Sequence, residues 1–540
     1  MVFPETLVKL GERAFSGCRN LQGIILPPEL GVINSNVFRD CFYISKIVCK
    51  SIEPPVISSS TFSGVAKDNF TVEVPDKSIN RYISDIKWGE FKRIGAYYDF
   101  SISRREMRTL KKEHRRDFTL RAPANYSWSV KSCPEWVTVE PQSGTGKTEV
   151  TITVKEMTAS DVQTFDVESG PYNNQKTTTY KGRGGDVIFQ LDDNNHTVNL
   201  KIEQYDSEHY DGKVITHHLA TKGNGVDIVF MGDCFDAQDI ATGKYMSGIN
   251  EAIGHYFDIE PYKTYKDYFN IYSVVGLSND SGMGTVNTIR DAKFGSQYLL
   301  EGIEPDFKTC YDYALKANSN IISRETLIVL VENTTDYGGI CYMWGDGSAI
   351  AVCPMSADAY PYDFRGIVQH EAGGHGFGKL GDEYIYHNQF ISSCNCGCCP
   401  HSATLLNGKA KGWYRNLELT GDMNEVGWSH FIFHPKYSNI VDIYEGGYYV
   451  TRGVYRSEPT SCMNNNIPYY SAISRQAMVE RIMEYAGEKF NLDEFIAKDV
   501  TTAGPTTKSA FEAMPIVEPI YNNGKQHAPV YMGEKPDFKK

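Results

Sequence analysis

The first hundred residues carry a repeated pattern of apolar positions. Six of these positions recur at a constant offset of 23 residues, which lies within the range of about 20–50 residues typical of solenoid repeats. The first set is Leu7, Leu10, Phe15, Cys18, Leu21 and Ile24, and the second is Leu30, Ile33, Phe38, Cys41, Ile44 and Ile47. A weaker third unit covers residues 54–62, and residues 70–94 are expected to form a closing cap. Because a solenoid needs a cap at each end, we expect further sequence before residue 1.

Residues 98–206 change to an alternation of apolar and polar positions. This alternation predicts short strands at 118–120, 126–130, 136–139 and 149–154. A turn cluster at 141–146 separates two of them, and Thr197–Gln204 is expected to be the closing strand. The polar stretch Ser169–Gly185 predicts a long surface loop. Together these signals favour a small β-sandwich.

From about residue 205 onward the pattern predicts an α/β unit. Residues 226–231, 269–275 and 326–332 predict buried strands. Residues 236–257 predict a helix that places Met246, Ile249, Ile253 and Phe257 on one face. Residues 337–343 and 349–353 predict two further strands that pair as neighbours around a glycine-containing turn.

Length and charge narrow the possible functions. A chain of 540 residues is too long for one ordinary domain, and the three patterns divide it into 1–97, 98–206 and 207–540. The net charge of −13 argues against nucleic acid or an anionic membrane as the main partner. No apolar run approaches the roughly 20 residues that span a bilayer. A hydrophobic content of 41% and a mean hydropathy of −0.39 describe a soluble, core-forming chain.

The most specific chemical signal lies at residues 369–384, which read Q-H-E-A-G-G-H-G-F-G-K-L-G-D-E-Y. In the H-E-x-x-H arrangement, two histidines on one helix face bind zinc and the glutamate activates water. Here the spacing is H-E-x-x-x-H, so His370 and His375 would lie about 140° apart on a regular α-helix. A π-bulge at Gly373-Gly374 would absorb the additional residue. We therefore expect His370 and His375 to bind zinc together.

The acidic pair that follows supplies the rest of the site. A catalytic zinc has three protein ligands and one open position. Asp382, seven residues after His375, is the expected third ligand, and Glu383 is the alternative. Glu371 is the expected general base, which would take a proton from the zinc-bound water and pass it to the leaving amine.

The series H-E-…-H-x-F-x-x-L-x-D-E-Y resembles the bacterial IgA-peptidase-type zinc metallopeptidases, whose usual form is H-E-x-G-H followed by the same tail. The resemblance implies zinc-dependent hydrolysis of peptide bonds. Ser461-Cys462-Met463 resembles the methionine turn that underlies the zinc in metzincin-like enzymes, with Met463 in that role. Tyr469 and Tyr470 follow closely and are candidates to reach an oxyanion. An exposed strand above the metal site would bind an extended peptide substrate by strand addition.

Two further resemblances lie before this region. The repeats, with A-F-x-x-C and I-x-L-P, look like the leucine-rich repeats of bacterial surface antigens, which implies a spacer or a binding surface. Residues 136–154 resemble the BACON domain of gut bacterial surface proteins, for which glycan or mucin binding is proposed and a structural linker is the alternative. The expected fold class is therefore multidomain. It combines a leucine-rich-repeat fragment with its cap at 1–97, an all-β sandwich at 98–206 and an α/β metzincin-like zinc peptidase domain at 207–540.

The thirteen cysteines include one cluster. An odd number excludes complete internal pairing. Cys394, Cys396, Cys398 and Cys399 lack the spacing of a C-x2-C zinc pair. Disulfides within this loop, including one to Cys462 or Cys353, would fit an exported protein. A structural metal held together with His401 is the alternative.

The expected function is that of an exported zinc endopeptidase, secreted or associated with the cell surface or outer membrane. Its first residues lack the features of a signal peptide, so we expect its natural start to be missing. The expected partner is a host or dietary protein or glycoprotein, immunoglobulin A among them, with glycan contact through the sandwich. One alternative is an adhesion or glycan-binding protein whose peptidase domain is inactive, which the inserted residue motivates. A zinc hydrolase acting on another amide, such as a cell-wall peptide, is a further alternative.

Overall fold

The computed structural model divides into two compact units. It describes residues 3–67, 70–97, 100–123, 126–169, 176–192, 196–285, 288–299, 302–318, 326–336, 338–391, 402–501 and 528–536. The first unit consists of Met1–Glu106, Arg115–Lys155 and Gly185–Lys201. The second consists of Met107–His114, Glu156–Gly184 and Ile202–Lys540. The second unit thus takes in three pieces of the region expected as a sandwich, residues 107–114, 156–184 and 202–206.

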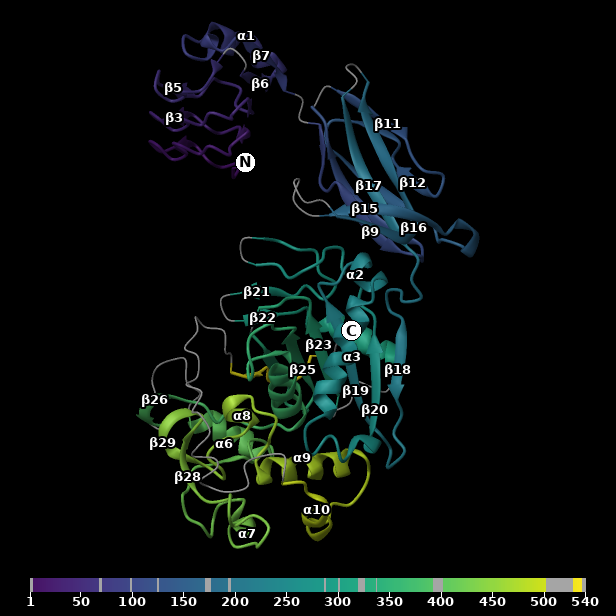
Figure 1. The fold of residues 1–540 in the computed structure, drawn as a ribbon, viewed down its shortest axis with the longest axis vertical. Helices are drawn as coiled ribbons and strands as arrows, with labels where there is room; N and C mark the ends of the chain where they lie inside the picture. The colour runs from purple at the N-terminus through teal and green to yellow at the C-terminus, as the bar shows by residue number, and fades with distance from the viewer. Residues whose placement is uncertain are drawn as a thin grey trace. The chain divides into compact units, whose positions relative to one another are not determined.

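Short parallel strands stack along the repeats in two small sheets (Figure 1). One sheet consists of β1 (Lys9–Leu10), β3 (Val32–Ile33) and β5 (Val56–Ile57), and the other of β2 (Gly23–Leu26), β4 (Lys46–Cys49), β6 (Thr71–Pro75) and β7 (Arg93–Tyr97). The rings of Phe15, Phe38 and Phe62 stack above one another with centroids 5.8 and 5.3 Å apart. Equivalent apolar positions therefore meet in successive repeats, which confirms the repeat prediction. The expected cap, residues 70–94, contains β6, α1 (Ile79–Ser84) and the first residues of β7.

Two sheets follow the repeats in sequence. The first has the order β12-β14-β10-β8 and the second the order β13-β11-β16-β17-β9, with β15 paired to β16. Their bounds are β8 (Ser101–Ile102), β9 (Glu106–Leu110), β10 (His114–Arg121), β11 (Ser127–Ser132), β12 (Val137–Glu140), β13 (Ser143–Thr145), β14 (Thr148–Val154), β15 (Gln163–Ser169), β16 (Lys176–Leu191) and β17 (Thr197–Tyr205). Each stretch that alternates in the sequence lies wholly or largely in one of these strands.

The loop expected at Ser169–Gly185 is wrong over residues 176–185. These residues begin the long strand β16, which pairs antiparallel with β15 from Ser169↔Lys176 to Gln163↔Gly182. The stretch is rich in threonine, a β-branched residue that fits a pleated surface. Its one large ring, Tyr180, packs against Tyr205 and Phe165 with centroids 5.3 and 6.1 Å apart. The apolar partners come from other strands, so the polar sequence concealed the strand.

A seven-stranded mixed sheet forms the centre of the second unit, in the order β18-β20-β19-β23-β25-β24-β30. Its strands are β18 (Val214–His218), β19 (Val226–Asp233), β20 (Phe269–Val274), β23 (Leu327–Glu332), β24 (Ile340–Met343), β25 (Ala349–Pro354) and β30 (Val530–Tyr531). The neighbouring pairs among β20, β19, β23 and β25 are parallel, whereas β24 is antiparallel to β25. The expected strands of this unit are therefore present.

Both faces of this sheet are buried by helices. Ile228 and Phe230 join one apolar cluster with α3 (Lys244–Phe257) and the histidine-bearing helix. Val229 and Met231 join a second cluster on the opposite face with α4 (Phe307–Ala317). Strands buried on both faces read as continuous apolar runs. This is why the sequence located them well.

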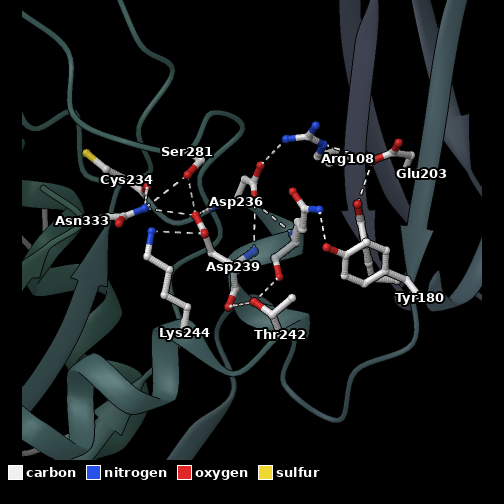
Figure 2. A network of polar contacts seen from close by, with 12 residues as sticks. Arg108, Tyr180, Glu203, Cys234, Asp236, Asp239, Thr242, Lys244, Ser281 and Asn333 are labelled. Atoms are coloured by element: carbon white, nitrogen blue, oxygen red, sulfur yellow. Dashed lines mark hydrogen bonds and ion pairs between the residues drawn. The ribbon is translucent and has the colours of Figure 1, made fainter. Parts of the chain in front are cut away.

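The helix expected at 236–257 is interrupted. It consists of α2 (Ala237–Ala241) and α3, and Gly243 between them has a φ of 82°, in the left-handed region that favours glycine. Asp236 caps α2 by accepting bonds from the backbone N–H groups of Gln238 and Asp239. Figure 2 shows Arg108 and Asn333 approaching the start of α2 from opposite sides, where Arg108 bonds to Asp236 and Asn333 to Asp239.

The remaining strands and helices of the second unit lie outside the seven-stranded sheet. A second sheet has the order β26-β29-β27, with β28 paired to β29. The bounds are β21 (Gln297–Leu299), β22 (Gly302–Glu304), β26 (Ile385–Phe390), β27 (Leu417–Glu418), β28 (Tyr444–Gly447), β29 (Tyr449–Arg456), α5 (Phe364–Ile367), α6 (Ser402–Ala410), α7 (Ser429–Ile432), α8 (Cys462–Asn465), α9 (Ala472–Tyr485) and α10 (Leu492–Lys498). Within the described part of the chain, none of the helices combines the length and apolar character that a bilayer crossing requires.

Candidate metal centre

The two histidines lie on a π-helix that spans Val368–Phe377 and continues directly from α5. A π-helix bonds residue i to residue i+5, as the Gly378 N–H does with the Gly373 carbonyl at 3.0 Å. Residues five apart therefore stand above one another, and the rings of His370 and His375 have centroids 4.7 Å apart. The additional residue is absorbed by one continuous π-helix of ten residues, which extends well beyond a single bulge.

The glycines of the motif are required by close packing. Neither Gly373 nor Gly374 is among the residues with positive φ. A Cβ atom on Gly374 would collide with the Met463 sulfur, and one on Gly373 would collide with the Tyr470 hydroxyl. Met463 is fully buried. The Met463 side chain therefore lies against the helix that carries the histidines, and a larger residue at position 374 would force it to shift.

We expect Gly374→Ala to destabilise the protein by about 1–3 kcal/mol, because overpacking a filled core forces neighbouring atoms apart. Thermal unfolding of the purified variant measures this change. Gly254→Ala is the matched control, because Gly254 lies within α3 and a Cβ there meets no atom within 4 Å. The control should be neutral or slightly stabilising, since alanine is a better helix former than glycine. Equal unfolding temperatures for the two variants would contradict the packing argument.

Three donor atoms converge beside the π-helix. The Nε2 atoms of His370 and His375 lie 3.0 and 3.2 Å from Oδ1 of Asp382 and 3.1 Å from each other. All three side chains are buried. Each histidine bonds through Nδ1 to a backbone carbonyl, His370 to Cys462 at 2.9 Å and His375 to Leu380 at 2.8 Å. In a neutral ring these bonds place the proton on Nδ1, so that the lone pairs of both Nε2 atoms face the shared centre.

This donor set suits a transition metal. Two imidazole nitrogens and one carboxylate oxygen form the three-ligand pattern of catalytic zinc sites. Burial alone would lower the pKa of His370, but bonds to Asp382 and to the Cys462 carbonyl raise it well above its usual value. The histidines hold the pKa of Asp382 below its usual range, against the effect of burial. The centre therefore attracts positive charge, which a proton or a cation can supply.

Glu371 lies next to this centre with a free oxygen. Among the described residues, its buried Oε2 has no hydrogen-bond partner. Burial raises the pKa of Glu371 to about 7, although the nearby His370 and His375 oppose the shift. Gly339, directly before β24, leaves the space that the Glu371 side chain fills, because a Cβ at that position would lie 2.7 Å from Cγ of Glu371.

Glu383 lies away from the three donor atoms. Its two carboxylate oxygens accept bonds from Asn416 at 2.9 Å and from Ser461 at 2.7 Å, and its N–H donates to the Met463 carbonyl at 2.8 Å. It therefore ties the segment after the π-helix to the Met463 turn. Of the two acidic residues, only Asp382 lies with the histidines.

The structure adds residues that the sequence did not identify. Tyr449 donates from its hydroxyl to Oδ2 of Asp382, and the Tyr384 ring stacks on His370 with centroids 5.4 Å apart. Tyr384 belongs to the recognised motif, whereas no local signal pointed to Tyr449. The hydroxyls expected near an oxyanion bond elsewhere, Tyr469 to Glu458 and Tyr470 to the Gln369 carbonyl. The cluster of Cys394, Cys396, Cys398, Cys399 and His401 lies outside the described residues.

Comparison with known proteins assigns two regions of the chain. A family model described as IgA Peptidase M64 matches residues 217–418, and one described as BspA type Leucine rich repeat region matches six copies within residues 1–86. None of the curated proteins matches the chain. Among solved structures, a Bacteroides ovatus GH5 xyloglucanase in complex with a XXXG heptasaccharide matches at 12% identity with a TM-score of 0.16. That match covers 44% of this chain and 46% of the xyloglucanase chain, and a likeness so weak carries no argument. The chain therefore contains a region similar to BspA-type leucine-rich repeats and a region similar to the IgA Peptidase M64 family.

Proposed function

We propose that this protein is a zinc-dependent endopeptidase. The observation that carries the proposal is the convergence of His370, His375 and Asp382, whose donor atoms all lie within 4.8 Å of one another. The buried Glu371 oxygen beside them has no partner among the described residues. Two facing imidazole lone pairs and a carboxylate repel one another unless a proton or a cation lies between them. The donor set therefore fits zinc.

Each residue of the centre has a proposed role. His370, His375 and Asp382 would hold the zinc, and Tyr449 orients Asp382 through the other carboxylate oxygen. When bound, zinc acts as a Lewis acid that polarises the peptide carbonyl and lowers the pKa of water. Glu371 accepts a proton at its free oxygen from the attacking water and then donates it to the leaving amine. A pKa of about 7 suits both transfers.

The additional residue between His370 and His375 is no longer a reason to expect an inactive peptidase domain. On an α-helix the five-residue spacing would direct the histidines apart, whereas the π-helix stacks them. The other members of the motif remain present as well. The alternative of an adhesion protein with an inactive peptidase domain therefore has no specific observation in its favour.

The proposal also covers the fold of the peptidase unit, the class of its substrate and the location of the protein. We propose a metzincin-like peptidase unit, since Met463 packs beneath the histidine helix, and a sandwich built from the two sheets of residues 98–206. The substrate class is a host or dietary protein or glycoprotein, and the description of the matching family suggests immunoglobulin A. The proposed location is outside the cell, either secreted or associated with the cell surface or outer membrane. No comparison supports glycan contact.

Chelation tests the proposed function. The purified chain, incubated with unfolded casein and with immunoglobulin A, should cleave at least one of them. We expect 1,10-phenanthroline to abolish cleavage and added zinc to restore it. The isomer 1,7-phenanthroline, which does not chelate, is the matched control and should leave the rate unchanged. Cleavage that survives 1,10-phenanthroline would overturn the zinc mechanism, and a zinc-loaded chain that cleaves neither protein would remove the support for an endopeptidase.

A further inference from the structure

The strand β24 begins at the candidate metal centre. Gly339, which precedes Ile340, packs against Glu371. The inner edge of β24 pairs antiparallel with β25 from Met343↔Ala349 to Ile340↔Val352. Its outer edge is the one on which an extended peptide could add as a further strand and place a peptide bond beside Glu371.

Residues 528–536 of the same chain already occupy part of this outer edge. β30 pairs parallel with β24, with Tyr342 opposite Val530 and Met343 opposite Tyr531. The Met532 N–H donates to the Met343 carbonyl at 2.8 Å, and the Gly345 N–H donates to the Gly533 carbonyl at 2.7 Å. These are the main-chain bonds that an added peptide strand would otherwise make.

Side chains fix this segment in place on both faces of the sheet. Val530 and Met532 pack against the apolar cluster of the α4 face. Tyr531 lies on the other face, with its ring centroid 5.9 Å from that of Trp413. Further along, the Lys535 ammonium lies 4.3 Å from the Tyr311 ring centroid and 3.5 Å from Asp346. A segment held at so many points competes effectively with a peptide from outside.

β30 pairs with only the second half of β24. Within the described chain, β30 pairs only at Tyr342 and Met343, so Ile340 and Cys341 have no partner strand on that side. At about 3.3 Å per residue, the two residues without a paired strand span roughly 7 Å of β24 at the end next to Glu371. A substrate strand longer than this would meet β30 on one side of the scissile bond.

We propose that residues 528–536 form an intramolecular strand that occupies half of the substrate-binding edge and limits access for extended peptides. The inference rests on the proposed function and names a regulation of the same site. Release of the segment would expose the whole length of β24. The partner that this surface fits is an extended peptide segment in β-conformation.

A pair of double variants tests the proposal. Met532→Pro with Lys535→Glu removes the N–H that bonds to Met343, because proline lacks it, and places a second negative charge near Asp346. Met532→Leu with Lys535→Arg is the matched control, which keeps the N–H and the charge. Lys535→Glu alone serves as a milder release variant that leaves the main chain unchanged. Zinc content and thermal unfolding of each variant check that the fold is kept.

Two readouts separate this inference from the proposed function. The first is cleavage of unfolded casein. The second is the affinity of a labelled nine-residue peptide with the sequence of residues 528–536, measured in a Glu371→Gln background. If the edge is occupied nine-tenths of the time, release should increase both the rate and the affinity by about tenfold relative to the control.

The cleavage rates and peptide affinities together show whether β30 limits access and whether the protein is an endopeptidase. Equal cleavage rates and equal peptide affinities in released and control chains would overturn the proposal, because β30 would then only complete the sheet. A peptide that binds the released chain more tightly, with no cleavage by any variant, would support the occupied edge and count against the endopeptidase. Failure of both readouts would overturn both inferences.

Discussion

We expect Glu371→Gln to lose nearly all peptide cleavage while it keeps its zinc. General base catalysis contributes about 10²–10⁴-fold to a rate, so kcat/KM should fall by at least about a hundredfold. Glutamine has the same shape but cannot accept and return the proton. It should also fit the space beside Gly339 that Glu371 now fills, so the fold should be kept.

Glu488→Gln is the matched control for this experiment. Glu488 is exposed, and the substitution makes the same chemical change away from the buried centre. It should cleave at the wild-type rate. Metal content, measured by mass spectrometry, should be about one zinc per chain in both variants. A Glu371→Gln variant that retains most of its activity would show that another group accepts the proton.

We expect His375→Ala to lose the zinc itself. His375 is fully buried and supplies one of three converging donor atoms, and alanine leaves only His370 and Asp382. Metal content should fall from about one zinc per chain to nearly none, and cleavage should fall with it. Zinc bound only to the folded state adds about 2.7 kcal/mol of stability at one hundred times its dissociation constant. Added zinc should therefore raise the unfolding temperature of the wild type by several degrees and leave that of the variant unchanged.

His196→Ala is the control for this loss, because His196 is exposed and lies directly before β17, away from the histidine helix in sequence. It should bind zinc like the wild type. If His375→Ala still held one zinc per chain, His375 would be no ligand. If the wild type held none after incubation with zinc at neutral pH, the zinc centre itself would be wrong.

The sequence alone determined the features that depend on local spacing. The 23-residue offset placed Phe15 and Phe38 in equivalent positions, and they stack in successive repeats. Continuous apolar runs located β19 and β23, because strands buried on both faces leave no polar position. The composition of the histidine motif identified the residues of the candidate centre and anticipated a π-type distortion.

Only the tertiary structure decided how these residues meet. Asp382 and Glu383 are neighbours in sequence, and their roles separate because Tyr449 bonds to the first while Asn416 and Ser461 bond to the second. Two glycines of the π-helix, Gly373 and Gly374, lie close to Tyr470 and Met463, which lie far along the chain. The pairing of β30 with β24 joins segments whose sequences carry no sign of each other. Such contacts depend on the path of the whole chain, because hydrogen bonds and packing act between atoms that are near in space, whereas local patterns record only the order of residues.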